Sequence, residues 1–481
     1  MVGTARRRLA LLTVAVVGVA FIPESTAAAG RQEPLLRLAA SGTATVERSA
    51  GQAFTLDTGM HVVAGRVPFE VRTKRASYDK PIVAKHLRER REVTLPPGLV
   101  NDFGGFPAFT HVRLADAAGD TVAEYDEPFC PNGKAVRART DAPATSPYPR
   151  RCAAFAPFAL GGVWGIQAGW SVPSAPQPWD AELLFLDDGT YTAVVSVNQP
   201  YRDLFGFVPG QWSVTVQVTV RTIAPLRTTA TPHTHQHSYG SLTPAGHRPA
   251  GKRGPTGPLP DLRALPAFSI YPFHEEGRDQ LAFAATVWVA GNTPLVVEGF
   301  RRSDQDVMDA YQYFYDTRGN QTGHAPVGTM RWDPREGHHH WHFTDFAQYR
   351  LLDAGKKVAV RSGKEAFCLA NTDAIDHTLP HANWQPVNTD LSAWCGNPAA
   401  VAVRQSLDVG NGDTYRQDLP GQSFDITDIP NGTYYIEIAA NPDGALHEQT
   451  TANNASLRMV VIGGTPGNRT VEVPPHGLVD A

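Results

Sequence analysis

The chain has 481 residues, more than one ordinary domain needs, and 42% of them are hydrophobic, enough to build two or three cores. Its 43 Gly and 39 Pro favour strands and turns over long helices. A formal charge of −4 excludes the basic surface that nucleic acid binding requires.

Residues 1–29 have the pattern of a signal peptide. Three arginines at positions 6–8 precede an apolar run over residues 9–22, and three alanines at 27–29 offer a cleavage site. The run is too short to span a bilayer, and we find no later candidate. Removing residues 1–29 takes away three Arg and one Glu, which changes the formal charge from −4 to −6. We therefore expect a secreted, extracellular protein without a membrane span.

Residues 226–258 differ in composition from the rest of the chain. They are rich in Thr, Pro, Gly, His and basic residues, which is typical of an extended linker. On both sides of this segment, alternating runs such as residues 212–220 and 433–440 predict strands. We expect an all-β fold of two tandem β-sandwich-like domains, a β-rich domain at 30–225 and a second at 259–470.

An internal repeat relates the two predicted domains. Residues 109–130 and 346–368 share a Phe, an Arg-Leu pair, an Asp-Ala turn and a Phe-Cys end, in the same order. Downstream, Cys152 and Cys395 each precede a Gly-Thr-Tyr motif by 37 positions. Two β domains can share such motifs by chance, but their order and spacing favour a duplication, with the first domain a degenerate copy.

The chain contains four cysteines, which are Cys130, Cys152, Cys368 and Cys395. An even number in an exported chain predicts two disulfides, but spacing alone leaves three pairings open. The repeat selects one bridge in each domain, Cys130–Cys152 and Cys368–Cys395.

Three histidines alternate at His338, His340 and His342. Alternate residues of a strand share one face, so these imidazoles would project together. Three nitrogen ligands with open positions suit Cu(II), although the geometry also admits zinc. The alternative is a histidine-rich surface turn.

A second set, His233, His235 and His237, has the same spacing within the predicted linker. Without a sheet to fix it, a metal must first order the segment, at about 1–2 kcal/mol per residue. We expect a weak chelator or a solvated tract without a role.

Several motifs in order resemble the lysyl oxidase family. Residues 337–353 resemble its copper-site segment, and residues 363–369, Gly-Lys-Glu-Ala-Phe-Cys-Leu, are similar to the segment that carries its cofactor lysine. Residues 412–415, Gly-Asp-Thr-Tyr, resemble the segment that carries its cofactor tyrosine. The resemblance covers about residues 259–460.

The resemblance implies that His338, His340 and His342 bind copper(2+), and that Lys364 and Tyr415 form a lysine tyrosylquinone that is the catalytic cofactor. Taken alone, Lys364 would be a surface lysine and Tyr415 a packed aromatic residue. Such a protein would be a copper-dependent amine oxidase. With O₂ and water, it would convert peptidyl lysine, or a small primary amine, to an aldehyde, hydrogen peroxide and ammonia.

The family also implies a calcium site of oxygen ligands, which suit Ca²⁺. Its residues here would be Asp261, Leu262, Glu448, Asn453 and Asn454. Thr450 stands where the family often has Asp, so the site could be weakened or absent. Three residues are candidates for the general base of the reaction, and each is also readily explained as structural: Asp413, His447 and Glu448.

The first domain lacks the residues of this chemistry. Shifting Tyr415 back by 243 positions leads to Val172, and shifting Lys364 by 238 leads to Asp126. Residues 101–106 contain no histidine. We expect a non-catalytic scaffold or substrate-binding module. The alternative for the whole chain is a non-enzymatic copper-binding or surface adhesion protein, which would form no quinone.

Overall fold

Strands make up nearly all of the regular structure, so the all-β prediction is confirmed. The computed structural model describes residues 34–88, 91–153, 156–174, 181–223, 248–303, 305–334, 340–344, 346–362, 366–386, 395 and 398–476. The predicted signal peptide, most of the predicted linker and the histidines at 233, 235 and 237 lie outside these ranges. The boundaries of the two domains stay predictions, and we call residues 34–223 the first half and 248–476 the second half.

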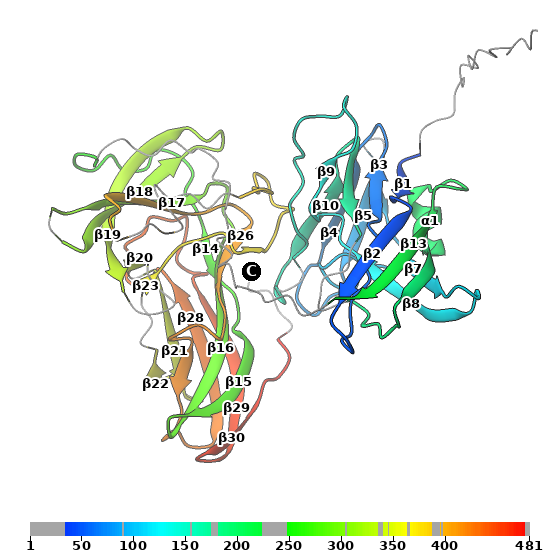
Figure 1. Cartoon of the computed structure of the whole chain (residues 1–481). Helices are drawn as coiled ribbons and strands as arrows, with labels where there is room; N and C mark the ends of the chain where they lie inside the picture. The colour runs from blue at the N-terminus through cyan, green and yellow to red at the C-terminus, as the bar shows by residue number, and fades with distance from the viewer. Residues whose placement is uncertain are drawn as a thin grey trace, which may run out of the picture. The chain divides into compact units, whose positions relative to one another are not determined.

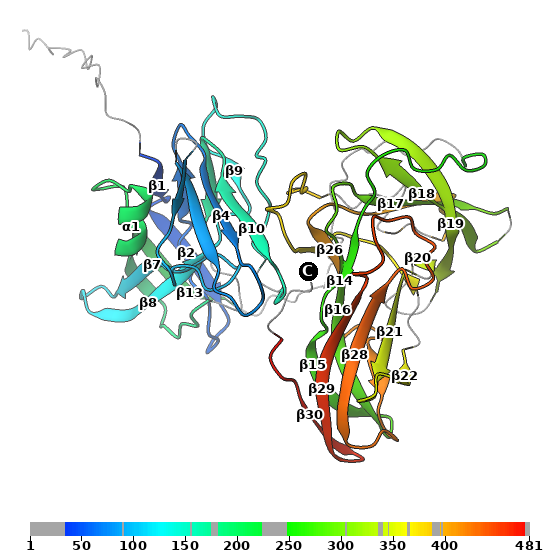
Figure 2. The same cartoon turned by 180° about the vertical axis from the view of Figure 1, so that it is seen from behind.

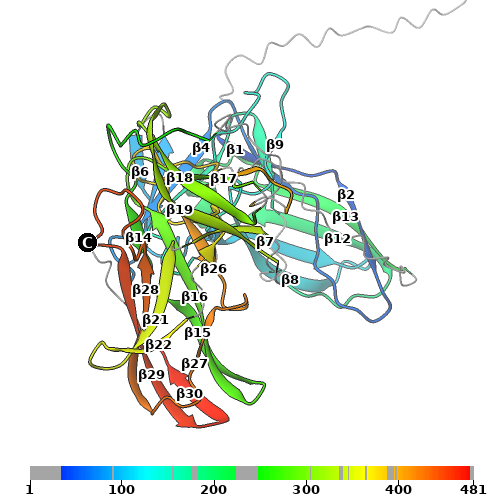
Figure 3. The same cartoon turned by 90° about the vertical axis from the view of Figure 1, so that its left-hand side faces the viewer.

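The described residues of the first half form three sheets, and the alternating burial of strands such as β12 reflects their alternating sequence. The five-stranded sheet runs in the order β2 (Thr43–Arg48), β13 (Ser213–Thr222), β12 (Gly189–Val197), β7 (Phe106–Ala115) and β8 (Thr121–Phe129) (Figure 3). A second sheet runs β1 (Leu36–Ala39), β3 (His61–Ala64), β11 (Trp170–Pro173) and β9 (Val136–Arg137). The third runs β10 (Gly161–Ile166), β4 (Phe69–Lys74), β5 (Val83–Arg88) and β6 (Arg91–Thr94).

One short helix, α1 (Gln199–Phe205), follows β12. Pro200 lies in its first turn, where the missing N–H of proline is tolerated. Gly206 ends the helix in the left-handed conformation at φ 67°, which glycine adopts without strain. None of the helices in the described ranges is long and apolar enough to cross a membrane.

In the second half, the residues that the structure describes also form three sheets. The five-stranded sheet runs β22 (Val358–Arg361), β21 (Ala347–Leu352), β28 (Gly432–Ala440), β29 (Ala455–Thr465) and β30 (Asn468–Glu472) (Figure 2). The next runs β14 (Leu262–Ala264), β16 (Arg278–Val289), β26 (Asn411–Tyr415) and β24 (Asp373–Ala374), and β15 (Phe268–Glu275) and β27 (Ser423–Asp425) also pair with β16. The third runs β23 (Ala366–Phe367), β20 (His340–Thr344), β19 (Gln321–Asp333), β18 (Val307–Tyr315), β17 (Leu295–Arg301) and β25 (Ala402–Leu407) (Figure 1).

Four strands of the five-stranded sheet in the first half correspond to four strands of the five-stranded sheet in the second half. In the first, Leu114 pairs with Ala193, and in the second, Leu351 pairs with Ile436 at the positions that the sequence repeat makes equivalent. The fifth strand differs, because β2 joins its sheet in parallel and β30 joins antiparallel. The shared order and register favour the duplication.

Two local contacts recur in the same places. The amide of Asn198 donates to the carbonyl of Phe109 at 2.9 Å, and the amide of Asn441 donates to Phe346 at 2.7 Å. Each half also closes one disulfide, and the predicted pairings Cys130–Cys152 and Cys368–Cys395 are confirmed. Each half has its own apolar core.

Candidate active site

His340 and His342 lie on β20, whose alternate residues Trp341 and Phe343 are buried in the core of the second half. β20 pairs with β19 on one side and with β23 on the other. The two histidine rings meet, with 2.7 Å between their Nε2 atoms. His342 is only 3% exposed, so its ring nitrogens need partners within the protein or a bound ion.

Asp333, at the end of β19, supplies one of these partners. Its Oδ2 lies 3.3 Å from Nδ1 of His342, and Asp333 is itself buried. When Nδ1 donates its proton to the carboxylate, the lone pair of Nε2 is available to a metal. Sequence reasoning missed Asp333, because only the register of β19 against β20 brings it beside the histidines.

This pair of nitrogens fits a metal of the predicted kind. Two imidazole ligands at right angles, each about 2.0–2.1 Å from a metal, would lie about 2.9 Å apart. His340 and His342 approach that separation. The third predicted ligand, His338, lies outside the described residues. Among the residues that are described, no three His, Cys, Asp or Glu side chains form a metal-binding group, so His340 and His342 alone do not complete the predicted set.

Tyr415 ends β26 and is held through its hydroxyl. The amide of Cys368 donates to this oxygen at 2.8 Å, and the hydroxyl donates to the carbonyl of Cys368 at 3.0 Å. The ring of Phe367 packs edge-on against it, with 5.0 Å between centroids. Burial raises the pKa of Tyr415 well above its ordinary value, and the charge of Asp413 raises it further. The phenol is therefore neutral near pH 7.

The histidine strand and the tyrosine meet through the segment around Cys368. Phe367 pairs with Phe343 of β20, directly before the residue that holds Tyr415. The amide of Trp341 also donates to the carbonyl of Cys395, the disulfide partner of Cys368, at 3.0 Å. Lys364 lies outside the described residues and precedes Cys368 by four positions in the sequence.

The three candidates for the general base occupy different surroundings. Asp413 is two residues before Tyr415 on β26, is 3% exposed, and its charge raises the pKa of Tyr415. His447 exchanges backbone hydrogen bonds with the side chain of Gln312 at 2.8 Å each way. Glu448 belongs to the cluster described next. Of the three, Asp413 is the one whose charge acts on Tyr415.

The five residues of the predicted calcium site do lie together. The side-chain nitrogen of Asn453 donates to both oxygens of Asp261 at 3.1 Å, and that of Asn454 donates to Glu448 at 2.7 Å. The amide of Leu262 donates to the other oxygen of Glu448 at 3.1 Å. Burial is the main cause that raises the pKa of Glu448, and the charge of Asp261 adds to it.

Two oxygens of this cluster fit a cation. The Oδ1 atoms of Asn453 and Asn454 are buried and lack a hydrogen-bond partner among the described residues. A half-turn of either amide would aim its oxygen at the carboxylates, as a shared Ca²⁺ would require. Arg263, however, donates to Asp261 at 3.1 Å and already supplies one positive charge there.

The comparison with known proteins concerns the second half. The model of the lysyl oxidase family matches residues 310–466. These residues are therefore similar to a lysyl oxidase domain. Its matched range includes His340, His342 and Tyr415, whereas Asp261, Leu262 and the whole first half lie outside it.

Similar curated proteins carry names from this family. Protein-lysine 6-oxidase of Sus scrofa is 33% identical over 125 residues, which are 26% of this chain and 44% of the relative. The human protein of that name is 33% identical over 125 residues, 26% of each chain. Human lysyl oxidase homolog 1 is 34% identical over 126 residues, 26% of this chain and 19% of the relative. The match thus spans less than half the length of these relatives.

Proposed function

We propose that the protein is a secreted, copper-dependent amine oxidase that converts peptidyl lysine or another primary amine to an aldehyde. The observation that carries the proposal is the hydroxyl of Tyr415 fixed to Cys368, one residue after a strand pair with β20 and its histidines. The lysyl oxidase domain at 310–466 supports the same chemistry. The names of the similar proteins support protein lysine as the substrate.

The histidines at 338, 340 and 342 would hold the copper, and Asp333 would fix the tautomer of His342. Copper with O₂ would supply the oxidation of the Tyr415 ring to a quinone joined to Lys364. A quinone carbon is electrophilic, and the substrate amine would bind there.

Tyr415 and Asp413 would have separate tasks. The two hydrogen bonds to Cys368 orient the ring of Tyr415 before it is modified. Asp413 is buried near this ring and would accept the proton from the carbon next to the substrate amine. Phe367 covers the ring and excludes water from one side.

Two further features belong to this proposal. The disulfides in both halves suit a protein exported to an oxidising compartment. Asp261, Leu262, Glu448, Asn453 and Asn454 would bind calcium, because their cluster contains two carboxylates and two buried amide oxygens without partners among the described residues. Calcium there would join residues 261–262, near the start of the second half, to residues 448–454, between β28 and β29.

The decisive experiment is peptide mapping by mass spectrometry after loading with copper in air. We expect one crosslinked species that contains the peptides of Lys364 and Tyr415, together with quinone absorbance and peroxide release on a primary amine. Tyr415→Phe should abolish all three signals. Tyr191→Phe, a change in the first half, is the matched control and should retain them. Copper binding without a crosslink would instead support the non-enzymatic alternative.

A further inference from the structure

The start of strand β10 in the first half lies against residues 375–378, the end of the segment 371–378 of the second half. The amide of Leu160 donates to the carbonyl of Ile375 at 2.7 Å, and the amide of His377 donates to the carbonyl of Gly161 at 2.9 Å. Gly161 also forms a parallel bridge with Asp376. The first half thus adds backbone hydrogen bonds to a segment of the second half, as a strand does at the edge of a sheet.

Only glycine fits at position 161. A Cβ atom there would lie 2.2 Å from Oδ1 of Asp376 and 2.7 Å from Oγ1 of Thr378. Asp376 is 3% exposed, and its carboxylate accepts a hydrogen bond from the amide of Thr378 at 2.9 Å, so it cannot move freely. The approach of β10 to this segment therefore depends on the missing side chain.

The same segment supports the strand that carries Tyr415. The amide of Thr372 donates to the carbonyl of Gly412 at 2.9 Å, and the amide of Thr414 donates to Oγ1 of Thr372 at 2.7 Å. The amide of Ile375 donates to the carbonyl of Gly410 at 2.9 Å. Residues 372–375 thus form one flank of β26, and β16 forms the other.

His377 links the two contacts. Its Nε2 lies 3.0 Å from Oδ1 of Asn411, the first residue of β26. Because Nδ2 of Asn411 donates to the carbonyl of Asn383 at 2.9 Å, its Oδ1 is the acceptor and His377 carries the proton on Nε2. Burial lowers the pKa of His377, so the ring remains neutral at pH 7 and this hydrogen bond persists.

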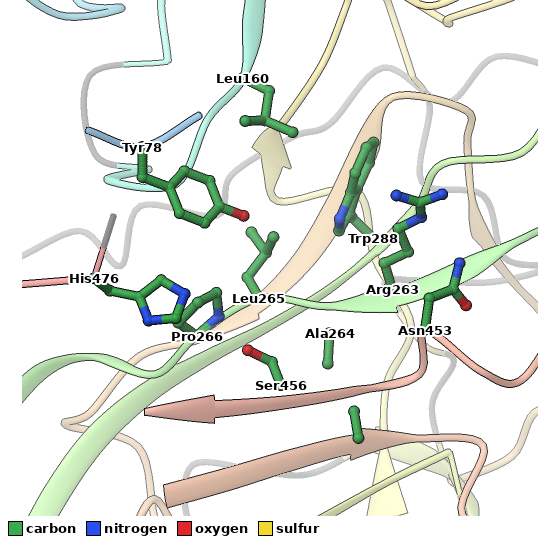
Figure 4. A pocket seen from close by; sticks show the side chains of 11 residues that line it. Tyr78, Leu160, Arg263, Ala264, Leu265, Pro266, Trp288, Asn453, Ser456 and His476 are labelled. Atoms are coloured by element: carbon green, nitrogen blue, oxygen red, sulfur yellow. The ribbon is translucent and has the colours of Figure 1, made fainter. Parts of the chain in front are cut away.

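Apolar side chains close the junction. Phe158 and Leu160 of the first half pack with Leu265, Trp288 and Ile375 of the second half. Figure 4 shows Leu160, Leu265 and Trp288 around a cavity of about 30 Å³, room for ordered water but not for a substrate. Trp288 is opposite Gly412 of β26 in the sheet register, so this cluster also rests on the tyrosine strand.

We infer that the first half is a positioning element for the catalytic tyrosine, with Gly161 as the residue that permits its docking. The inference rests on the proposed function. β24 contains only two residues and lies at the edge of its sheet, so it restrains β26 poorly by itself. Leu160 and Gly161, at the start of β10, hold Ile375 and His377 directly after β24, and this keeps Tyr415 against Cys368.

The test compares Gly161→Ala with Gly189→Ala in the full chain. A Cβ at Gly189 meets only Tyr191, at ordinary distances of 3.7 Å or more, so this control should change nothing. In metal-free protein, Gly161→Ala should speed hydrogen exchange of residues 372–377 and 410–415 at least tenfold. Exchange in the sheet of β7 and β12 should stay as in the parent protein.

After copper loading, Gly161→Ala should bind the metal normally but form several-fold less quinone per copper. Unchanged exchange in residues 410–415 and unchanged quinone yield would overturn the inference. If the variant does not fold, Leu160→Ala removes packing without a clash and decides the same question by the same measurements. Should the parent protein form no quinone, the proposed function fails, while the exchange comparison still tests the docking.

Discussion

The third sheet of each half begins alike and ends differently. In the first half it runs β10-β4-β5-β6 and stops, whereas the second half runs β25-β17-β18-β19 and continues with β20 and β23. Of the two added strands, β20 carries His340 and His342, and β23 ends directly before Cys368, which holds Tyr415. The comparison teaches that the chemistry belongs to an extension of a shared frame, and that the frame itself is no evidence of activity.

The second sheets show where the tyrosine has no counterpart. They share the orders β1-β3-β11-β9 and β14-β16-β26-β24. The two sheets can be aligned by the Leu-Arg pair that begins β1 and β14. In this alignment Val172 lies at the position of Asp413, which is two residues before Tyr415. The shift of 243 positions, which makes Val172 the counterpart of Tyr415, is therefore wrong by two residues. The position of Tyr415 falls on Ser174, whose amide donates to the carbonyl of Met60 at 2.9 Å.

The largest effect should come from removing the histidines of the added strand. The double change of His340→Ala and His342→Ala removes both candidate copper ligands of β20. We expect at least about a 100-fold loss of copper affinity and no detectable peroxide release. Replacing His233, His235 and His237 with Ala is the matched control and should leave turnover nearly unchanged. Copper titration and peroxide assay measure both, and an inactive linker variant would refute the assignment.

A matched pair of core residues tests the shared frame. Phe109 and Phe346 occupy equivalent positions and are 0% and 1% exposed. Their carbonyl oxygens accept hydrogen bonds from the amides of Asn198 and Asn441, respectively. Changing either phenylalanine to Ala should lower the free energy of unfolding of its half by about 3–5 kcal/mol, because each leaves a buried cavity.

Denaturant unfolding, followed by hydrogen exchange in each half, separates the two losses. Phe346→Ala should also reduce quinone formation, because its ring contacts Phe367, which packs on Tyr415. A difference above about 2 kcal/mol between the two variants would show that the halves do not share one frame.

The sequence predicted features that depend on local pattern or on the repeat. Alternating residues predict the strands, and the spacing of motifs selects Cys130–Cys152 and Cys368–Cys395. The alternating spacing of His340 and His342 also predicts that they share one face of a strand, and their rings meet in the structure.

What the sequence could not predict depends on register between distant strands. Asp333 reaches His342 only because β19 pairs with β20, and nothing in its spacing indicates this. The docking of Gly161 on Asp376 joins residues 215 positions apart. A linker between two β-rich segments gives no sign of such a contact.

An intermediate effect concerns a buried acid of the first half. Burial, with the charge of Asp57 as a second cause, raises the pKa of Glu127 to about 7 from an ordinary 4.5. A raised carboxyl pKa means that the folded state favours the neutral form. Its contribution to stability is complete below pH 4.5 and is lost as the pH rises through 7.

Glu127→Gln should therefore stabilise the first half at pH 8 by up to about 3 kcal/mol and change little at pH 4. Unfolding midpoints of the parent and the variant across this range measure the effect. A constant difference at every pH would mean that the carboxyl is not neutral in the folded state. The second half should be unaffected, since Glu127 lies in the core of the first.

The smallest effect tests the comparison most finely. The hydroxyl of Tyr191 donates to the carbonyl of Asp187 at 2.9 Å, and that of Tyr434 donates to the carbonyl of Pro430 at 2.8 Å, four residues back in both halves. Changing either tyrosine to Phe keeps the ring and removes one hydrogen bond, so each should cost about 0.5–1.5 kcal/mol. Because both variants remove the same bond at equivalent positions, their losses should agree within about 0.5 kcal/mol, and neither should change the quinone yield. A loss of quinone in Tyr434→Phe alone would mean that the hydrogen bond from Tyr434 to Pro430 helps to place Tyr415 in the second half. The two halves would then differ in the function of this hydrogen bond as well as in their added strands.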